Sequence, residues 1–327
     1  MEILVCPGCR TRTADRLDVR TLARTGDVLT CECGRTYPVV DGVPIVLADP
    51  TAYFGSEIAT VVERDLAPEV AALLVAGGPD DAPYPRMLEH LSIYMDAHWG
   101  DRVSPPPDGP GAQLADALLA KLRALPRVAL AVELGCSVGR FVAELARTAD
   151  RVVGVDLHHG ALRRARRMLA GEAVAYARRM IGRHYRGATA AAGELATDRA
   201  TLICGDALDP PLIPGVYDRV VALNLLDSVA NPHQLLSVID ALCAPGGELV
   251  IASPYSWQSS IVAEGHRIGA DDPGRALVAL LTTGQDLGSR YQIEDEADLP
   301  WTLRRDARSA ATYCIHYLRA RKASGNV

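Results

Sequence analysis

Two closely spaced pairs of cysteines near the start of the chain could bind a metal ion. Cys6 and Cys9 are separated by two residues, Cys31 and Cys33 by one, and 21 residues lie between the pairs. Two such pairs on two tight turns are typical of a four-thiolate zinc site. Because such a site has no open coordination position, we expect Zn²⁺ to have a structural role. Four free thiols in a metal-free fold are the alternative.

A second pattern that could bind a ligand is the stretch AVELGCSVGRF, residues 131–141. A hydrophobic run ends at Glu133, and a glycine loop follows before a helix-like segment. Glycine lets the backbone approach a ligand closely, and the first N–H groups of the helix are free to bind it. The spacing from Gly135 to Gly139 differs from the G-x-G-x-x-G of dinucleotide-binding proteins. Glu133 suits the cationic amino-acid end of S-adenosylmethionine, with Cys136 as a small residue of the same loop.

Two more carboxylates follow strand-like runs. Asp156 ends RVVGVDL at the point where a ribose diol is bound in nucleotide-binding sheets, and Asp206 follows the run ATLIC. A turn or helix-cap residue is the simpler explanation for each acid alone. Three acids in this order, with the Pro-Gly-Gly turn before ELVIAS, resemble class I S-adenosylmethionine-dependent methyltransferases. The resemblance implies that Asp206 and the N–H group of Ala207 meet the adenine.

The full set of cofactor-binding residues that this comparison implies is drawn from the ends of four strands. It comprises Glu133, Gly135, Cys136, Gly139, Asp156, Leu157, Asp206, Ala207 and Asn224. S-adenosyl-L-methionine is therefore the expected cofactor beside zinc.

The methyl acceptor of class I enzymes lies over the carboxyl ends of the fourth and fifth strands. Asn224 ends the fourth run, where amino-methylating relatives carry the Asn of N-P-P-Y, although the Pro-aromatic part is missing here. We expect Asp227 to hold or deprotonate the acceptor nitrogen, and Asn224 and Tyr255 to orient it. Trp257 or Trp301 could shield developing positive charge. The alternative is that Asp227 caps the next helix.

Longer stretches extend the comparison to residues 129–321. NLLDSVANPHQLL, GGELVIASPYSW and DLPWTLRRDARS resemble the N-methyltransferase domain of mercaptohistidine (ovothiol-type) biosynthesis. The resemblance implies a small amino-acid-derived acceptor with an imidazole, guanidine or amine nitrogen, in natural-product metabolism. The insertion AYARRMIGRHYRGATAAAGE departs from that family.

An aromatic cluster upstream could complete the acceptor pocket. Tyr94, His98 and Trp99 lie within six residues of each other in a helix-like segment, and Trp301 and Arg304 are further lid residues. Packing of these aromatics in the core is the alternative. The arginines at 163, 164, 166, 167, 178, 179, 183 and 186 predict a solvated helix face, with a contact to an acidic substrate or RNA as the alternative.

The elements that must position these residues form three regions. Residues 1–49 contain short strand-like runs, and CECGRTYPVVDGVPIVLADP resembles the small zinc-ribbon proteins that activate tRNA, rRNA and release-factor methyltransferases. Residues 50–126 look mostly helical, as a lid or linker. From residue 127 to 327, apolar runs alternate with helical patterns, which predicts a doubly wound α/β sheet. The class I resemblance implies seven mostly parallel, Rossmann-like strands.

Composition limits the functional classes. The net charge of −6 argues against a surface that coats nucleic acid. No apolar run reaches about 18 residues, so no membrane span is expected, and the N-terminus lacks a signal-peptide pattern. We expect a cytoplasmic enzyme whose partner is a small molecule, and we leave a homodimer open. The alternatives are an RNA methyltransferase with an N-terminal zinc module and a cofactor-binding scaffold without activity.

Overall fold

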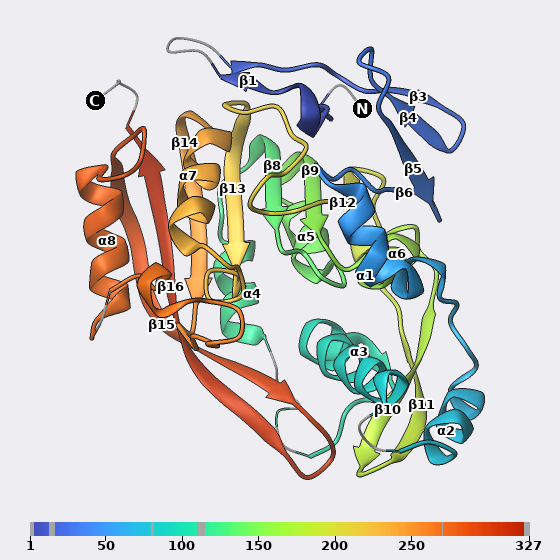
Figure 1. Ribbon diagram of the computed structural model, residues 1–327. Coiled ribbons are helices and arrows are strands. Elements are labelled where there is room, and N and C mark those ends of the chain that lie inside the picture. Colours follow the sequence, from blue (N-terminus) through green and yellow to red (C-terminus); the bar gives the residue numbers. More distant parts are fainter. Residues whose placement is uncertain are drawn as a thin grey trace.

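The N-terminal region is a small β-rich module, as the sequence predicts. The computed structural model describes residues 3–12, 17–79, 82–109, 111, 115–269 and 271–323. The module contains β1 (Thr11–Arg12), β2 (Leu17–Asp18), β3 (Ala23–Thr25), β4 (Val28–Thr30), β5 (Thr36–Val40) and β6 (Val43–Pro44). Strands β3 to β6 form one antiparallel sheet and β1 pairs with β2. We call residues 3–49 the N-terminal module, drawn in blue in Figure 1.

A mainly helical segment follows. It contains α1 (Pro50–Val62), α2 (Pro68–Ala76), α3 (Pro83–Trp99), the short strand β7 (Val103–Ser104) and α4 (Asp116–Arg123). The first three helices begin at a proline, whose fixed φ and missing N–H suit a first helical turn. The proline-rich residues 105–109 are not helical, as expected. Within the described ranges, no helix is long and apolar enough to cross a membrane.

The predicted seven-stranded, mostly parallel sheet is confirmed. Its strands are β8 (Val128–Leu134), β9 (Ala149–Asp156), β12 (Ala200–Cys204), β13 (Tyr217–Leu223), β14 (Cys243–Ser253), β15 (Tyr291–Arg304) and β16 (Ala310–Lys322). Their order is β12-β9-β8-β13-β14-β16-β15. The first five are parallel, and β16 pairs antiparallel with β14 and with β15. The carboxyl ends of the parallel strands therefore share one edge.

Hydrophobic cores cover both faces of this sheet. Helices α5 (Arg140–Leu145) and α6 (His159–Leu169) pack with α4 on one face, and α7 (Pro232–Leu242) and α8 (Pro273–Thr283) pack on the other. Successive residues of a strand point to opposite faces: Val152 of β9 lies in the first core and Val153 in the second. Burial on both faces explains why these strands are continuously apolar in the sequence.

The N-terminal module covers a part of the sheet that lacks a helix. Residues 205–216, all of them described, connect β12 to β13 without a helix. In their place, Leu4 pairs with Leu212, and Arg10 binds the carboxylate of Asp209. Residues 43–47 run beside β12, where Ile45 pairs in parallel with Cys204. The module therefore extends the edge of the sheet and closes one of its cores.

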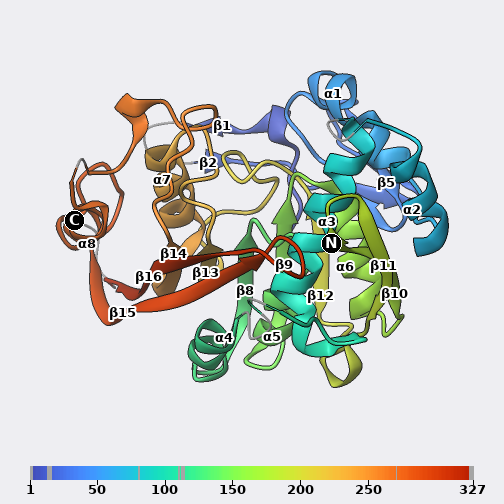
Figure 2. The same ribbon diagram turned by 90° about the horizontal axis from the view of Figure 1, so that it is seen from below.

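An inserted hairpin, β10 (Val174–Ile181) and β11 (His184–Ala190), lies between α6 and β12 in the sequence and pairs with β7. Helix α3 packs between this hairpin and the far half of the β15–β16 hairpin, as Figures 1 and 2 show. Buried Asp96 of α3 links all three: its carboxylate binds Arg178 of β10 at 3.0 Å and Arg304 of β15 at 3.0 Å. This ion-pair cluster fixes the position of α3.

The expected solvated helix face of arginines is only partly observed. Four of the eight arginines lie on or beside the inserted hairpin rather than on a helix. Arg163 and Arg164 of α6 are largely buried and bind the carboxylates of Glu63 and Asp65. Acidic residues of the α1–α2 connection thus neutralise them, a long-range contact that helical spacing does not reveal.

The packing of the N-terminal module on the sheet yields a testable prediction. Ile45 is fully buried, so Ile45→Ala should lower the free energy of unfolding of the whole enzyme by about 2–5 kcal/mol. Urea unfolding monitored by tryptophan fluorescence measures the loss. Val28→Ala, a change at an exposed position of the same module, should cost less than about 0.5 kcal/mol. A separate early transition in Ile45→Ala, with the main transition unmoved, would contradict a shared core.

Candidate functional site

The four predicted zinc ligands lie together. The Sγ atoms of Cys6, Cys9, Cys31 and Cys33 are all within 4.8 Å of one another. The distance is 3.9 Å between Cys6 and Cys33 and 3.7 Å between Cys9 and Cys31. A tetrahedron of thiolates with bonds of about 2.3 Å to zinc has edges of about 3.8 Å, so the residues fit a zinc ion. Zn²⁺ bound there would cross-link the two turns of the N-terminal module.

The glycine loop after β8 has a backbone conformation and close packing that only glycine allows. Gly135 has φ of +76°, and a Cβ built there would lie 2.8 Å from Leu225 Cδ1. Glu133 before it is buried, and its Oε2 has no hydrogen-bond partner in the described part of the chain. Burial, together with the nearby Asp156, raises the pKa of Glu133 well above its usual range. The unpartnered buried oxygen fits the ammonium group of S-adenosylmethionine, whose positive charge would offset both the burial and the nearby Asp156.

Asp156 at the end of β9 is held in place by the same loop. Its Oδ2 accepts a hydrogen bond from Ser137 N at 2.8 Å, and its Oδ1 accepts one from His158 N at 2.8 Å. Each oxygen retains a lone pair for a further donor, as a ribose diol requires. Burial raises the pKa of Asp156, against the lowering effect of these backbone bonds.

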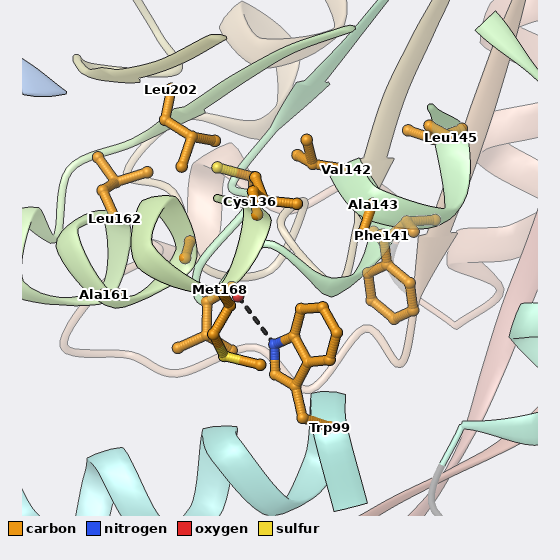
Figure 3. Packing of buried hydrophobic residues seen from close by; sticks show 14 of the residues in the cluster. Trp99, Cys136, Phe141, Val142, Ala143, Leu145, Ala161, Leu162, Met168 and Leu202 are labelled. Atoms are coloured by element: carbon orange, nitrogen blue, oxygen red, sulfur yellow. Dashed lines mark hydrogen bonds between the residues drawn. The ribbon is translucent and has the colours of Figure 1, made fainter. Parts of the chain in front are cut away.

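The remaining predicted cofactor residues differ in their placement. Leu157 is half exposed next to Asp156, where it could cover an aromatic base. The Oδ1 atom of Asp206 accepts from Leu208 N at 2.8 Å, so this acid also stabilises a turn, and Ala207 is buried beside it. The thiol of Cys136 points into the core among Val142 and Leu162, as Figure 3 shows. Only the backbone of Cys136 can face a ligand, because its side chain fills the space beside the strand glycine Gly154.

A cavity of about 280 Å³ adjoins the cofactor residues. Gly135, Ser137, Asp156 and Asn224 line one side of it. Helix α3 and the far end of the β15–β16 hairpin line the other side, through His90, Tyr94, His98, Trp301, Leu303 and Tyr313. Loop residues after β13 and β14, including Asp227 and Ser256, complete the wall. The predicted lid residues Tyr94, His98 and Trp301 therefore meet the predicted cofactor and acceptor residues in one space.

Two predicted lid residues do not line this cavity. The side chain of Trp99 is fully buried and donates from Nε1 to Val138 O at 2.9 Å, the bond drawn in Figure 3. Successive residues of a helix are rotated by about 100°, which turns Trp99 away from the face of His98. Arg304 is buried against Asp96, because alternate residues of β15 face opposite sides and Trp301 and Leu303 take the cavity side.

Tyr255 and Trp257 also lie outside the wall of this cavity. Tyr255 has φ of +51°, an uncommon value for a non-glycine residue. Its hydroxyl hydrogen-bonds His316 Nδ1 at 2.8 Å, and its ring packs on that of Trp257. The turn therefore carries both rings away from the cavity, which leaves neighbouring Pro254 and Ser256 to line it.

Asn224 and Asp227 present free acceptor atoms in the cavity wall. Neither Asn224 Oδ1 nor Asp227 Oδ1 has a hydrogen-bond partner among the described residues, although both atoms are buried. Asp227 Oδ2 accepts from Ser256 N at 2.8 Å, and burial raises the pKa of this carboxyl. Asn231, rather than Asp227, caps α7 by accepting from the backbone of Gln234. The helix-cap alternative for Asp227 is therefore wrong.

His90 is a cavity residue that the sequence analysis missed. It lies one helical turn before Tyr94 and two before His98, so the spacing 90, 94, 98 could have revealed one shared face. Although its ring is accessible from solvent, the surrounding protein and His158 lower the pKa of His90 to about 4. Burial, together with Arg140, lowers the pKa of His98 to about 3. Both imidazoles are thus neutral near pH 7.

A larger depression of about 840 Å³ lies elsewhere, between the N-terminal module and the C-terminal ends of α5 and α6. Its described lining contains none of the predicted cofactor, acceptor or lid residues. Its arginines include Arg147 and Arg166, and cations beside helix C-termini complement the helix dipole. The smaller cavity, rather than this larger depression, therefore brings the predicted cofactor and acceptor residues together.

The zinc site predicts the metal content. The purified protein should contain about one zinc ion per chain, because four thiolates saturate one tetrahedral ion. The double variant Cys6→Ser with Cys31→Ser should lose it, whereas Cys314→Ser, at an exposed cysteine far along the chain, should keep it. Elemental analysis after dialysis decides between these outcomes. Equal zinc content in the double variant and the wild type would contradict the assignment.

The cofactor site predicts a loss of affinity in Asp156→Asn. Replacing the carboxylate removes a charge-assisted hydrogen bond, which corresponds to a roughly tenfold to hundredfold weaker binding of S-adenosylhomocysteine. Asp150→Asn, at an exposed carboxylate near the start of the same strand, should bind like the wild type. Titration calorimetry measures both. Unchanged affinity in Asp156→Asn would show that this carboxylate does not bind the cofactor.

Comparison with known proteins finds two families that match parts of the chain. Residues 132–251 match the family described as "Methyltransferase domain", and residues 1–42 match "Trm112p-like protein". The first match contains Glu133, Asp156, Asp206 and Asp227, and the second contains all four clustered cysteines.

Solved structures with a similar chain path were also found. One is a complex between the Haloferax volcanii Trm112 methyltransferase activator and a methyltransferase, with 15% identity, 73% of this chain and 95% of that chain covered, and a TM-score of 0.44. Another is the N-methyltransferase NodS from Bradyrhizobium japonicum WM9 with S-adenosyl-L-homocysteine, with 17% identity, 66% and 89% covered, and a TM-score of 0.42. The assignment rests on the two matched domains and the residues described above. The chain is a methyltransferase with a methyltransferase domain in residues 132–251 and, before it, a Trm112p-like domain in residues 1–42 whose four clustered cysteines fit a zinc ion.

Proposed function

We propose that this enzyme methylates a nitrogen atom of a small amino-acid-derived molecule. The observation that carries the proposal is the pair of buried, unpartnered acceptors Asn224 Oδ1 and Asp227 Oδ1 in a cavity next to the cofactor residues. Buried acceptors without partners are costly, so their site favours a ligand that brings N–H donors. An imidazole, guanidine or amine nitrogen brings such donors, whereas a thioether or a carbon nucleophile does not.

When bound, S-adenosylmethionine would supply a methyl group on a sulfonium, an electrophile for the lone pair of a neutral nitrogen, with the thioether as leaving group. The protein's part is orientation and proton transfer. Asp227 Oδ1 accepts a proton from the incoming nitrogen, which must be neutral when it attacks. Asn224 Oδ1 holds a second N–H and leaves the lone pair free. Ser256 N fixes the other oxygen of Asp227 at 2.8 Å and so orients the carboxylate.

We further propose that residues 1–49, 50–126 and 127–327 act as zinc module, acceptor wall and catalytic domain. The contribution of His90, Tyr94 and His98 to the cavity supports a substrate-facing role for the middle segment. The burial of Arg163, Arg164 and Arg178 in ion pairs leaves them unavailable to a phosphate backbone. This supports a small-molecule acceptor over RNA.

The test is the kinetics of Asp227→Asn. Asparagine can still accept from Ser256 N through its carbonyl oxygen, so the loop should keep its shape. Turnover should fall by about 10²–10⁴ because the proton acceptor is lost, while affinity for S-adenosylhomocysteine stays near that of the wild type. Radiolabelled methyl transfer, after a screen of histidine, arginine and their derivatives, measures turnover, and mass spectrometry locates the methyl group.

Asp150→Asn, the exposed change on β9, serves as the control with the same loss of charge and should keep full turnover. Full turnover of Asp227→Asn on the same acceptor would remove Asp227 from the mechanism. A methyl group found on oxygen, sulfur or carbon would refute N-methylation itself.

A further inference from the structure

We propose that the methyl acceptor is a small cationic amine without a carboxylate or phosphate group, an amine rather than the parent amino acid. The proposal rests on the proposed N-methyltransferase function and narrows its substrate class. The observations that carry it are the charges, aromatic rings and free acceptors of the cavity wall.

Among the described residues that line it, the wall offers no free cation to an anionic substituent. Besides histidines, the charged residues of its described lining are Asp156, Asp227 and Arg164. The guanidinium of Arg164 is already bound: Nη1 donates to Glu63 Oε1 at 2.9 Å and Nη2 lies 2.6 Å from Asp65 Oδ1. Its Nε is enclosed by protein atoms and so is inaccessible to a ligand.

The histidines of the described wall do not offer a free cation to an anion either. His158 Nδ1 accepts a hydrogen bond from Ala161 N at 3.0 Å, so this nitrogen is already used as the cap of α6. The protein surroundings hold the pKa of His90 and of His98 far below 7. Among the acidic and basic residues of the described lining, histidines aside, Asp156 lies with the cofactor residues and Arg164 is paired, so Asp227 is the one that faces the acceptor.

Aromatic rings surround the space beside this carboxylate. His98 lies 5.0 Å from Phe141 and 5.8 Å from Trp301 between ring centroids, and Phe141 lies 6.0 Å from Trp301. Tyr94 continues the series at 6.0 Å from His98. Ring faces attract a desolvated cation, and a methylated ammonium product is an even larger, more weakly hydrated cation. Aromatic residues make up only 5% of the chain, so their gathering here is a feature of this site.

Charge complementarity predicts a higher affinity for an amine than for its parent amino acid. The ammonium group can bind Asp227, whose Oδ1 is buried and unpartnered among the described residues. A carboxylate on the same small molecule would lie within several ångströms of Asp227 without a counter-ion. Neutral donors such as Tyr94 and Gln258 can hydrogen-bond that carboxylate but do not offset its charge. Coulomb's law at the effective dielectric of protein sites gives a preference for the amine of about tenfold to a hundredfold.

The test uses matched pairs of amine and amino acid: histamine with histidine, agmatine with arginine, and tyramine with tyrosine. Binding of each compound to the enzyme saturated with S-adenosylhomocysteine is measured by calorimetry, with the zinc-loaded full chain. In at least one pair the amine should bind about tenfold to a hundredfold more tightly than its amino acid. If no amine binds more tightly than its parent, including the case in which none binds, the proposal is overturned.

A charge placed in the wall tests the cause of the preference. Gln258 is an exposed lining residue, and Gln258→Arg should raise the affinity for the amino acid about tenfold relative to the amine. Gln285→Arg makes the same charge change at an exposed position outside the cavity lining and should leave the preference unchanged. Equal preferences in the two variants would show that the charge of the cavity does not set the selectivity.

A separate readout distinguishes this proposal from the proposed function. Methyl transfer to the amine, analysed by mass spectrometry, shows whether nitrogen is the acceptor atom. If the amine binds more tightly but is methylated on an atom other than nitrogen, N-methylation is refuted and the preference for an amine over its amino acid is retained. If the amino acid binds more tightly and is methylated on nitrogen, N-methylation is retained and the preference for an amine is refuted.

Discussion

The structure depends on a cover for the β12 edge of the seven-stranded sheet and for the face beside it, where none of the described helices lies. A doubly wound sheet needs a cover on both faces, yet the connection from β12 to β13 contains no helix. Pro210, Pro211 and Pro214 crowd this connection, and proline is unfavourable inside a helix. The N-terminal module fills the space instead, with Ile3, Leu4 and Val46 in the same core as Val155 and Ile203. The folding of the four-cysteine module and the packing of the sheet are therefore coupled through a shared core.

The same contacts connect the module to the ligand site. The loop that the module binds, residues 205–216, contains Asp206 and Ala207 near its start. On the other side of the cavity, Asp96 holds α3 against two hairpins that are remote in sequence. A buried carboxylate between two arginines is strongly destabilised when one partner is removed. The cavity wall is thus supported by ion pairs outside it, while the acceptors Asn224 Oδ1 and Asp227 Oδ1 inside it have no partner among the described residues.

Much of the catalytic domain could be predicted from the sequence, because its signals are local. The apolar runs at the five parallel strands and the acids that follow them reflect burial and strand ends. The four cysteines are recognisable from spacing alone. The cavity wall formed by α3 and β15 was harder to predict from the sequence. The spacing of His90, Tyr94 and His98 is periodic, but Trp99 and Arg304 point away from the cavity because of helical rotation and strand alternation. Tyr255 lies outside the cavity because of a positive φ, and no sequence pattern signals that backbone angle.

The covalent link between the N-terminal module and the enzyme changes how their contact depends on concentration. When a stabilising partner is a separate chain, dilution or competition from other clients reduces the fraction that is bound. Here Asp49 ends the module and Pro50 begins α1, so the two parts meet at a high effective concentration set by the chain itself. Each enzyme molecule thus has its own cover at a fixed one-to-one ratio.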